Sequence, residues 1–399
     1  MDAFVAQLSL PTDFSAQRKS ASERRIQQLR DLLQDRRNIL VLMHNDPDPD
    51  AIASGFALQR LIGHLVPKAP VTLAHGGMMG RAENRTMAAV VIPHVRRISS
   101  RTAAQALPKY DAILLVDTQP SAGNHLLYEI DYPPDQIVLA IDHHPPRRSQ
   151  VRAVIHDVRP EIGATATLLA EYVAVSGMDI DGELATALFY GIKSDTRGLS
   201  RHTTALDIWA YTALRNFVDT DLLNQIEQVR LPRSYFRGIS DALMNTTLYQ
   251  CSDSPQTEIE ETDDEQNEMH GDEQPCTGYT SVSLLFQMQR PDMAAEVADL
   301  ILRMEDVSWA ICLGIFEDHL VISVRTDSPK ARAGRLVRAI VGKNGAAGGH
   351  DTMAGGRIHT PDATPAQRIA ELHALVPRFL QMLGAGESVG APLLDKSDP

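Results

Sequence analysis

The sequence predicts an α/β protein, with a mainly parallel sheet flanked by helices and a smaller α/β domain after it. Its 399 residues suffice for two domains, and 43% of them are hydrophobic, which supports ordinary packed cores. Between residues 38 and 214, short apolar runs alternate with amphipathic helical patterns, as in parallel sheets. Acids and histidines directly follow several of these runs. Open α/β sheets place their sites at such carboxyl ends of strands.

The first apolar run ends in a dense group of ionisable side chains. Residues 38–43 predict a buried strand, and His44, Asp46, Asp48 and Asp50 follow it at alternate positions. An extended segment points alternate side chains the same way. Three like charges this close repel strongly unless cations neutralise them. The pattern therefore favours a metal site over its alternative, a solvated acidic loop.

Two later apolar runs and one helical pattern also end in acids or histidines. The side chains at these ends are Asp117, Asp142, His143, His144 and Asp195. One acid after a strand is usually a cap or turn residue, but four such sites on successive elements are hard to assign to turns. Mixed carboxylate and imidazole ligands suit manganese, with magnesium or zinc disfavoured but not excluded. We therefore expect one metal centre.

In order and spacing, these four segments resemble the motifs of the DHH phosphoesterases. A fifth segment, from Gly348 to Gly356, is similar to the glycine-rich motif of the associated C-terminal substrate domain. The resemblance covers residues 38 to 358 and implies an active site in the cleft between the two domains. It also implies two-metal hydrolysis of phosphoester bonds, in which ions about 3.5–4 Å apart stabilise the attacking and leaving oxygens.

The resemblance implies six ligands for two manganese ions, with magnesium as a substitute. They are His44, Asp48 and Asp117 for one ion, and Asp50, His143 and Asp195, with Asp117 shared, for the other. Asp46, Asp142 and His144 complete the expected catalytic centre. The two acids would orient the ligands, and His144 would donate to the phosphate or the leaving group. The alternative for His144 is a structural histidine behind the metals.

Seven further residues are expected to contact substrate. They are Arg81, Asn84, Arg201, Arg325, Gly348, Gly349 and His350. The last three would form a loop whose backbone approaches an anion closely, and Arg325 would bind a second phosphate through its fork of donors. Simpler alternatives stay open: a surface ion pair for Arg325, and ordinary helix starts for the segments around Arg81 and Arg201.

The chain divides into six expected segments. They are an N-terminal extension with a helix (1–37), the DHH domain (38–218), a connecting helix and linker (219–250), an acidic disordered insertion (251–276), the substrate-binding domain (277–385) and a flexible tail (386–399). The first helix is expected from Ser22 to Leu33, with Ser22 as its N-cap, and the next from Asp50 to Leu65.

The net charge of −13 is mostly local. Residues 252–274 contain ten acids and no Lys or Arg, and removing them leaves −3 for the rest of the chain. Their composition predicts a disordered surface loop, with docking of a protein partner as the alternative. No basic tract is present for following a long nucleic-acid backbone. Long duplex nucleic acid is therefore not expected as a partner.

The favoured function is hydrolysis of short nucleotides: short oligoribonucleotides, linear or cyclic dinucleotides, or adenosine 3′,5′-bisphosphate. An exopolyphosphatase or pyrophosphatase is one rival hypothesis, and a catalytically silent nucleotide-binding regulator is another. No apolar run approaches membrane-spanning length, no signal pattern is present, and the three cysteines have no C-x-x-C spacing. A cytoplasmic protein that does not bind membranes is expected, and homodimer formation stays an open hypothesis.

Overall fold

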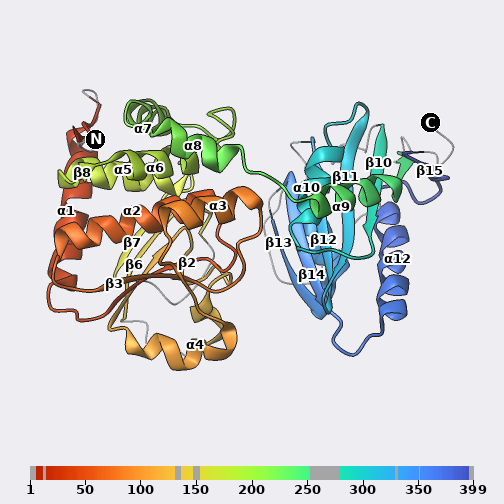
Figure 1. Cartoon of the computed structure of the whole chain (residues 1–399), viewed down its shortest axis with the longest axis horizontal. Helices are drawn as coiled ribbons and strands as arrows, with labels where there is room; N and C mark the ends of the chain where they lie inside the picture. Colours follow the sequence, from red (N-terminus) through yellow and green to blue (C-terminus); the bar gives the residue numbers. More distant parts are fainter. Residues whose placement is uncertain are drawn as a thin grey trace, which may run out of the picture. The chain divides into compact units, whose positions relative to one another are not determined.

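The computed structural model describes residues 6–11, 15–130, 136–146, 153–251, 278–328, 331–349 and 351–394. The chain forms two compact units, Met1–Arg230 and Leu231–Pro399, each with its own main sheet (Figure 1). Each unit also has its own hydrophobic cores. The expected α/β fold, with a parallel sheet and a second α/β domain, is confirmed. The expected cleft between the domains stays a prediction. Residues 252–277 of the acidic insertion lie outside the described residues.

The first unit contains a six-stranded sheet in the order β4-β3-β2-β5-β6-β7, and every neighbouring pair is parallel. Its strands are β2 (Ile39–Met43), β3 (Val71–His75), β4 (Arg96–Arg97), β5 (Ala112–Val116), β6 (Ile137–Asp142) and β7 (Ile155–Val158). In chain order, β3 and then β4 are added on one side of β2. The strands β5, β6 and β7 are then added in turn on the other side of β2. The strand order therefore reverses between β2 and β5, and such a point opens a crevice at the carboxyl ends of strands.

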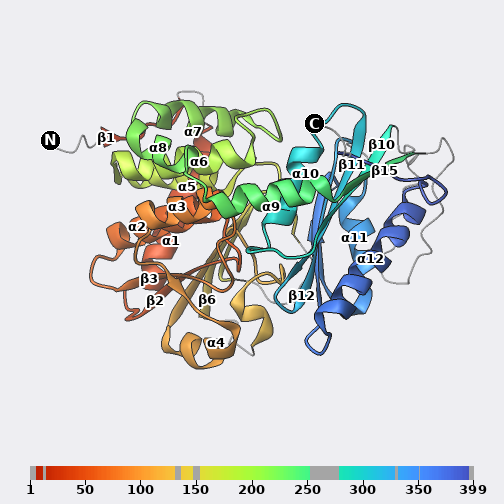
Figure 2. The same ribbon diagram turned by 45° about the vertical axis from the view of Figure 1, so that its right-hand side comes forward.

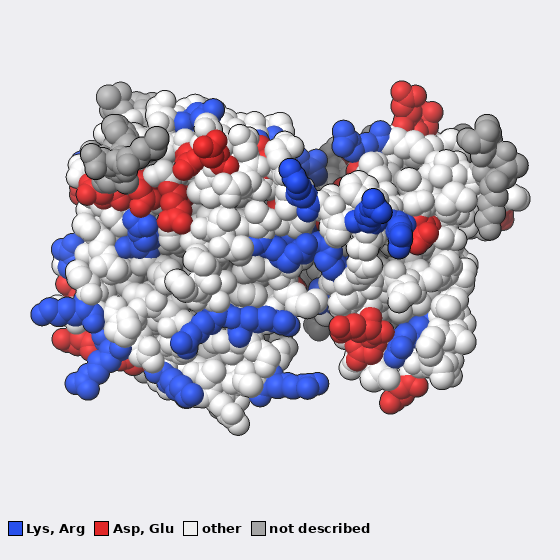
Figure 3. Space-filling view, viewed as in Figure 1, with Lys and Arg blue, Asp and Glu red and all other residues white. Residues whose placement is uncertain are grey.

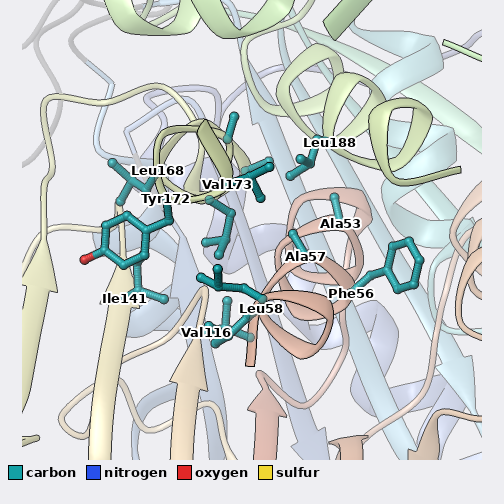
Figure 4. Close-up of a cluster of buried hydrophobic side chains, with 14 of the residues drawn as sticks. Ala53, Phe56, Ala57, Leu58, Val116, Ile141, Leu168, Tyr172, Val173 and Leu188 are labelled. Atoms are coloured by element: carbon teal, nitrogen blue, oxygen red, sulfur yellow. The ribbon is translucent and has the colours of Figure 1, made fainter. Parts of the chain in front are cut away.

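Helices cover both faces of this sheet. The helices of this unit are α1 (Ala16–Leu33), α2 (Pro49–Leu65), α3 (Ala82–Val91), α4 (Ser100–Ala106), α5 (Thr165–Ser176), α6 (Gly182–Asp195), α7 (Ala205–Arg215) and α8 (Thr220–Glu227), of which α7 and α8 pack on other helices. Alternate residues of each strand enter opposite cores: Val41 packs with α2, α5 and α6, whereas Leu40 packs on the face that α4 covers. Figure 4 shows side chains of α2 and α5 meeting above Val116 and Ile141.

The first helix starts earlier than the sequence predicts. Its N-cap is Ser15, whose side chain accepts from the backbone N–H of Arg18, and not Ser22. Ser22 is fully buried inside the helix, where its hydroxyl donates to Glu171 of α5. A serine that looks like a cap is thus a contact between two helices. A short ribbon of β1 (Ala6–Gln7) and β8 (Asp179–Ile180) also belongs to this unit.

The second unit contains a seven-stranded sheet in the order β13-β14-β12-β11-β10-β9-β15. Its strands are β9 (Thr246–Gln250), β10 (Tyr279–Leu285), β11 (Val307–Phe316), β12 (His319–Thr326), β13 (Gly345–Gly349), β14 (Met353–His359) and β15 (Ala391–Pro392). Only β10 and β11 are parallel among the described pairs, and α10 (Met293–Ile301) connects them. Two strands, β9 and β15, thus lie within the segments expected as a linker and a tail.

Helices lie on both faces of this second sheet as well. Trp309 and Ile311 pack with α11 (Ala333–Val341) and α12 (Pro365–Met382), which lie side by side in Figure 2. Ala310 and Cys312 face α10 and α9 (Arg233–Met244) on the opposite side. None of the described helices has the length and apolar character needed to cross a bilayer.

The glycine-rich segment is a strand where the sequence predicts a loop. Gly348 and Gly349 belong to β13 and pair with Gly355 and Ala354 of β14, while His350 lies outside the described residues. Gly349 has φ 142°, and a Cβ there would lie 2.4 Å from Met353 O. Glycine is therefore required at this position because β13 and β14 approach closely. The glycine content of the segment does not by itself predict that pairing.

The described cysteines differ in state. Cys251 is disulfide-bonded, whereas Cys312 is free and buried.

Candidate metal centre

Three neighbouring strands bring their polar ends to the point where the strand order reverses. His44 follows β2, Asp117 follows β5, and Asp142 is the last residue of β6. The next helix starts at once, because Asp48 is the N-cap of α2 and its carboxylate accepts from the N–H of Ala51 at 3.0 Å. Asp50 lies in the first turn of that helix, where negative charge is favourable.

Asp117 occupies the middle of the group and faces histidines on two sides. Its Oδ2 lies 3.5 Å from His44 Nε2, and its Oδ1 lies 3.8 Å from both His143 Nε2 and His144 Nδ1. Asp117 itself has φ 54°, a left-handed conformation that aspartate tolerates better than most residues. The backbone thus turns sharply after β5 and places one carboxylate between separate sets of donors.

Two groups of potential metal ligands lie here, and Asp117 belongs to the first. His44, Asp48 and Asp117 offer ligand atoms within 4.8 Å of one another, and Asp50, His143 and Asp195 do the same. In the second group, His143 Nε2 lies 3.3 Å from Asp195 Oδ2 and 3.9 Å from Asp50 Oδ2. The structure therefore brings together, in two groups, all six side chains that the resemblance implies as ligands. Whether they bind ions is a proposal.

The donor set suits a divalent cation. His143 Nε2 is buried and has no hydrogen-bond partner among the described residues, whereas Nδ1 of the same ring lies 3.2 Å from Ile162 O. A donor bond from Nδ1 to that carbonyl leaves the lone pair of Nε2 facing the carboxylates, as in metal-binding histidines. This nitrogen lies 3.3 Å from Asp195 Oδ2, so it is satisfied either by a proton shared with the acids or by a cation bound among them.

Burial and close opposite charges shift the pKa values in this cluster. Burial would raise the pKa of Asp117, but contact with His44 and the charges of His144 and His143 outweigh it and hold that pKa below its ordinary value. Burial would lower the pKa of His44 and His143, but nearby aspartates raise both well above the usual range. Burial, Asp117 and Asp195 together raise the pKa of Asp50. The acids thus favour positive charge at the neighbouring histidines, as they would favour a bound cation.

Asp142 positions His144. The carboxylate is fully buried and accepts from the backbone N–H of His144 at 3.1 Å, while its Oδ1 lies 2.8 Å from His144 Nδ1. Gln119 donates to the other oxygen at 3.0 Å. Burial lowers the pKa of His144, but the hydrogen bond with Asp142 and the charge of Asp117 raise it overall. His144 therefore combines a fixed ring with a tendency to retain a proton.

Asp46 and Asn84 hold the loop that contains the ligands. Asp46 Oδ1 accepts from the N–H of Met78 at 2.9 Å, and buried Asn84 donates to Pro47 O at 3.4 Å. Asn84 thus has a structural contact in the place where a substrate contact was expected. Arg81 is exposed at the N-cap position of α3.

Thr165 is a part of the centre that the sequence did not reveal. Its hydroxyl donates to Asp117 Oδ1 at 2.8 Å, and its backbone N–H donates to Asp50 Oδ2 at 2.6 Å. Ala166 N–H donates to the other oxygen of Asp50 at 2.7 Å. The amino end of α5 thus orients both acids. A helix beginning directly beyond the ligand strands is the signal that would have indicated this contact.

The other expected substrate contacts lie in different surroundings. Arg201 is partly buried, and its Nε has no partner among the described residues. Burial and the neighbouring charge of Arg197 lower its pKa. In the second unit, Arg325 donates to Asp299 at 2.6 Å and to Ser323 at 3.1 Å. The ion pair that was the alternative for Arg325 is thus present.

Comparison with known protein families gives two matches. The sequence matches the DHH family N-terminal domain over residues 38–192 and the DHHA1 domain over residues 282–382. An uncharacterized protein of Methanocaldococcus jannaschii is 28% identical over 355 residues, covering 88% of this chain and 65% of the relative. This chain therefore spans just under two thirds of the length of that relative.

Comparison with solved structures shows a shared fold. An exopolyphosphatase-related protein from Bacteroides fragilis superimposes with a TM-score of 0.63 at 16% identity, covering 94% of this chain and 99% of that chain. RecJ from Thermus thermophilus, solved in complex with Mn²⁺, has a TM-score of 0.44 at 15% identity, covering 93% of this chain and 56% of that chain. The fold of the first structure thus extends over nearly all of this chain.

Proposed function

Because the chain belongs to the DHH family of metal-dependent phosphoesterases, we propose that it hydrolyses phosphoester bonds of short nucleotides with two manganese ions. The observation that supports a two-ion centre most directly is Asp117. Its two carboxylate oxygens face His44 on one side and His143 with His144 on the other. A carboxylate shared in this way suits a pair of ions, which would activate water and neutralise charge on attacking and leaving oxygens.

The chemistry of the ligands supports manganese. Four carboxylates and two imidazoles form the two groups around Asp117. Oxygen ligands suit magnesium and manganese, and added imidazoles shift the preference towards manganese. His44, Asp48 and Asp117 would hold one ion, while Asp50, His143 and Asp195 would hold the other with Asp117.

His144 is proposed to act on the phosphate. Asp142 fixes its ring through Nδ1, and the pKa of His144 is raised by the hydrogen bond with Asp142 and by Asp117, against the effect of burial. In its protonated form, a histidine held in this way donates a hydrogen bond from its other nitrogen. We expect that donation to go to a non-bridging oxygen or to the leaving group.

The second unit is proposed to bind the remainder of the nucleotide. Gly348 has open space where a Cβ would stand, which leaves its backbone accessible to an anion. Arg332 and Arg338 are exposed at the start and near the end of α11, and Gly334 packs against Gly349 O, where a Cβ would lie at 2.7 Å. The helix thus starts beside the glycine strand, with basic side chains at its surface.

The rival substrate is polyphosphate or pyrophosphate, which the basic residues of α11 would also suit. On the face that Figure 3 shows, Lys and Arg lie in separate groups with uncharged surface between them. A long polyanion is bound best by a continuous basic surface. The separation of the basic groups on this face therefore favours a short substrate.

The test is hydrolysis of the 5′-phosphorylated diadenylate pApA with manganese, with pyrophosphate and tripolyphosphate tested in parallel. We expect AMP release by the parent protein and by an Asp35→Asn control, which changes an exposed acid, and none by Asp117→Asn. Phosphate release from the polyphosphates alone would establish the rival. Hydrolysis of pApA by Asp117→Asn at the parental rate would contradict the proposal.

A further inference from the structure

A second group of metal-ligating side chains lies in the unit that does not contain the proposed catalytic centre. Asp318, His319 and His359 offer ligand atoms within 4.8 Å of one another. Asp318 is in the turn between β11 and β12, His319 begins β12, and His359 ends β14. The expected catalytic chemistry uses none of them.

The sheet holds the two histidines together. His319 and His359 are direct partners in the antiparallel pairing of β12 with β14, so their side chains leave the same face. Their rings stack, with centroids 4.6 Å apart and planes 25° apart. Two imidazoles on paired strands form a chelate with little conformational freedom to lose when an ion binds.

Asp318 completes the group as a third ligand. Its Oδ1 lies 2.7 Å from His319 Nδ1, and its Oδ2 lies 2.8 Å from His359 Nε2. Thr360 donates its backbone N–H to Asp318 O at 2.8 Å, and Arg368 of α12 donates to Thr360 O at 2.9 Å. The backbone of the turn is therefore held in place from outside the group, as the surroundings of metal ligands usually are.

We propose that Asp318, His319 and His359 form a zinc-binding site on the second unit. Two imidazoles and one carboxylate are a ligand set that zinc accepts, with a fourth position left for water. Zinc–ligand distances of about 2.0–2.2 Å place tetrahedral ligand atoms roughly 3.4 Å apart. The carboxylate oxygens of Asp318 lie 2.7 Å from His319 Nδ1 and 2.8 Å from His359 Nε2, so these contacts would widen by less than about 1 Å when an ion binds. The side chains are partly exposed, so an ion reaches them from solvent.

This site differs from the proposed catalytic centre in its ligands and in its effect. Imidazoles predominate here, which favours zinc, nickel or copper, whereas carboxylates predominate around Asp117. An ion bound to both strands would fasten β12 to β14 at the end where the turn lies. We therefore infer a stabilising ion for the second unit.

The test counts zinc bound by the full-length protein after equilibration with zinc alone. Variants His319→Ala and His359→Ala are compared with the parent and with His373→Ala, which removes an exposed histidine of α12. We expect the first two variants to bind one ion fewer per chain than the parent, and the control to bind as many as the parent. Ions at the centre around Asp117 contribute equally to all four proteins.

A second measurement separates the site from a general change in the protein. Zinc should raise the thermal midpoint of the second unit in the parent and in His373→Ala, but not in His359→Ala. Equal zinc counts in all four proteins would overturn the proposal. An equal loss in His373→Ala would also overturn it, by showing nonspecific surface binding. The outcome of the pApA assay does not decide this proposal, because none of these residues belongs to the proposed catalytic centre.

Discussion

At the scale of single residues, the centre depends on how each carboxylate is oriented. Asp50 is buried, and its carboxylate accepts hydrogen bonds from two backbone N–H groups at the start of α5. Each oxygen therefore has only some of its lone pairs left for a cation. Asp117 accepts one hydrogen bond from the Thr165 hydroxyl, on the oxygen that faces His143. Contacts of this kind fix ligand geometry before any ion binds.

Replacing Thr165 with valine tests this orientation directly. Valine keeps the shape of the side chain but removes the hydroxyl that donates to Asp117. We expect manganese affinity to fall by about 10–100-fold, the range typical for loss of a group that orients a metal ligand. Calorimetric titration with manganese measures the change, and Thr165→Ser should restore most of the affinity. Parental affinity in the valine variant would show that the hydroxyl has no orienting role.

The sequence predicted the residues whose signal is local and missed those whose contacts are distant. Asp117 and Asp142 end apolar runs, so their place at the edge of the sheet follows from the pattern. Thr165 contacts Asp117 across 48 residues, and Gln119 contacts Asp142 across 23. No periodicity records such a contact, because it depends on how the strands are ordered in the sheet.

At the scale of elements, continuous apolar runs were the reliable signal. β2, β5 and β6 are buried on both faces, so their sequences are almost wholly apolar. The strand β13 is rich in glycine and has no large apolar residue, so its sequence predicts a loop, because glycine has low strand propensity. Its strand conformation comes from pairing with β14, which the isolated segment does not encode.

Close packing of helices places Asp50 and Asp195 near each other, and Gly191 makes that packing feasible. A Cβ at Gly191 of α6 would lie 2.8 Å from Ala53 Cβ of α2 and 3.2 Å from Ala166 Cβ of α5. Gly191→Ala should therefore destabilise the first unit by about 1–3 kcal/mol and weaken manganese binding.

The matched control is Gly63→Ala, since nothing lies within 4 Å of a Cβ at that position of α2. It should be neutral or stabilising by about 0.4–1 kcal/mol. Urea denaturation and manganese titration of both variants provide the comparison. Parental stability and affinity in Gly191→Ala would refute the packing argument.

A buried ionic network joins β7 to α1 and α5 and should make stability depend on pH. Asp157 is 2% exposed. Its carboxylate accepts two hydrogen bonds of 2.8 Å from Arg159 and one of 2.7 Å from the Tyr172 hydroxyl. Burial would raise the pKa of Asp157, but these bonds and the charge of Arg25 lower it. A lowered folded-state pKa means that Asp157 stabilises the fold above its unfolded pKa of about 3.9, and that this contribution is lost as the pH falls through the folded value.

The variant Asp157→Asn should therefore be less stable than the parent at about pH 7, by roughly 3–5 kcal/mol, with the difference shrinking as the pH falls below the unfolded pKa of about 3.9. Urea denaturation at several pH values measures it. An exposed control, Asp179→Asn, should match the parent throughout. A difference between parent and Asp157→Asn that stays constant with pH would contradict this assignment.

At the scale of the whole molecule, strand order creates the centre. The six expected ligands are spread from residue 44 to residue 195, yet all belong to the first unit. The reversal of strand order between β2 and β5 brings His44 and Asp117 together, and β6 adds His143 beside them. We therefore expect metal binding to need only the first unit, whereas the choice of substrate depends on the second.

Electron paramagnetic resonance of the manganese-loaded protein tests most directly whether Asp117 would be shared by two manganese ions. Ions about 3.5–4 Å apart that share a carboxylate are magnetically coupled. We expect a coupled two-manganese signal in the parent and its loss in Asp117→Asn, with Asp35→Asn unchanged. A signal from isolated manganese in the fully loaded, active parent would contradict it.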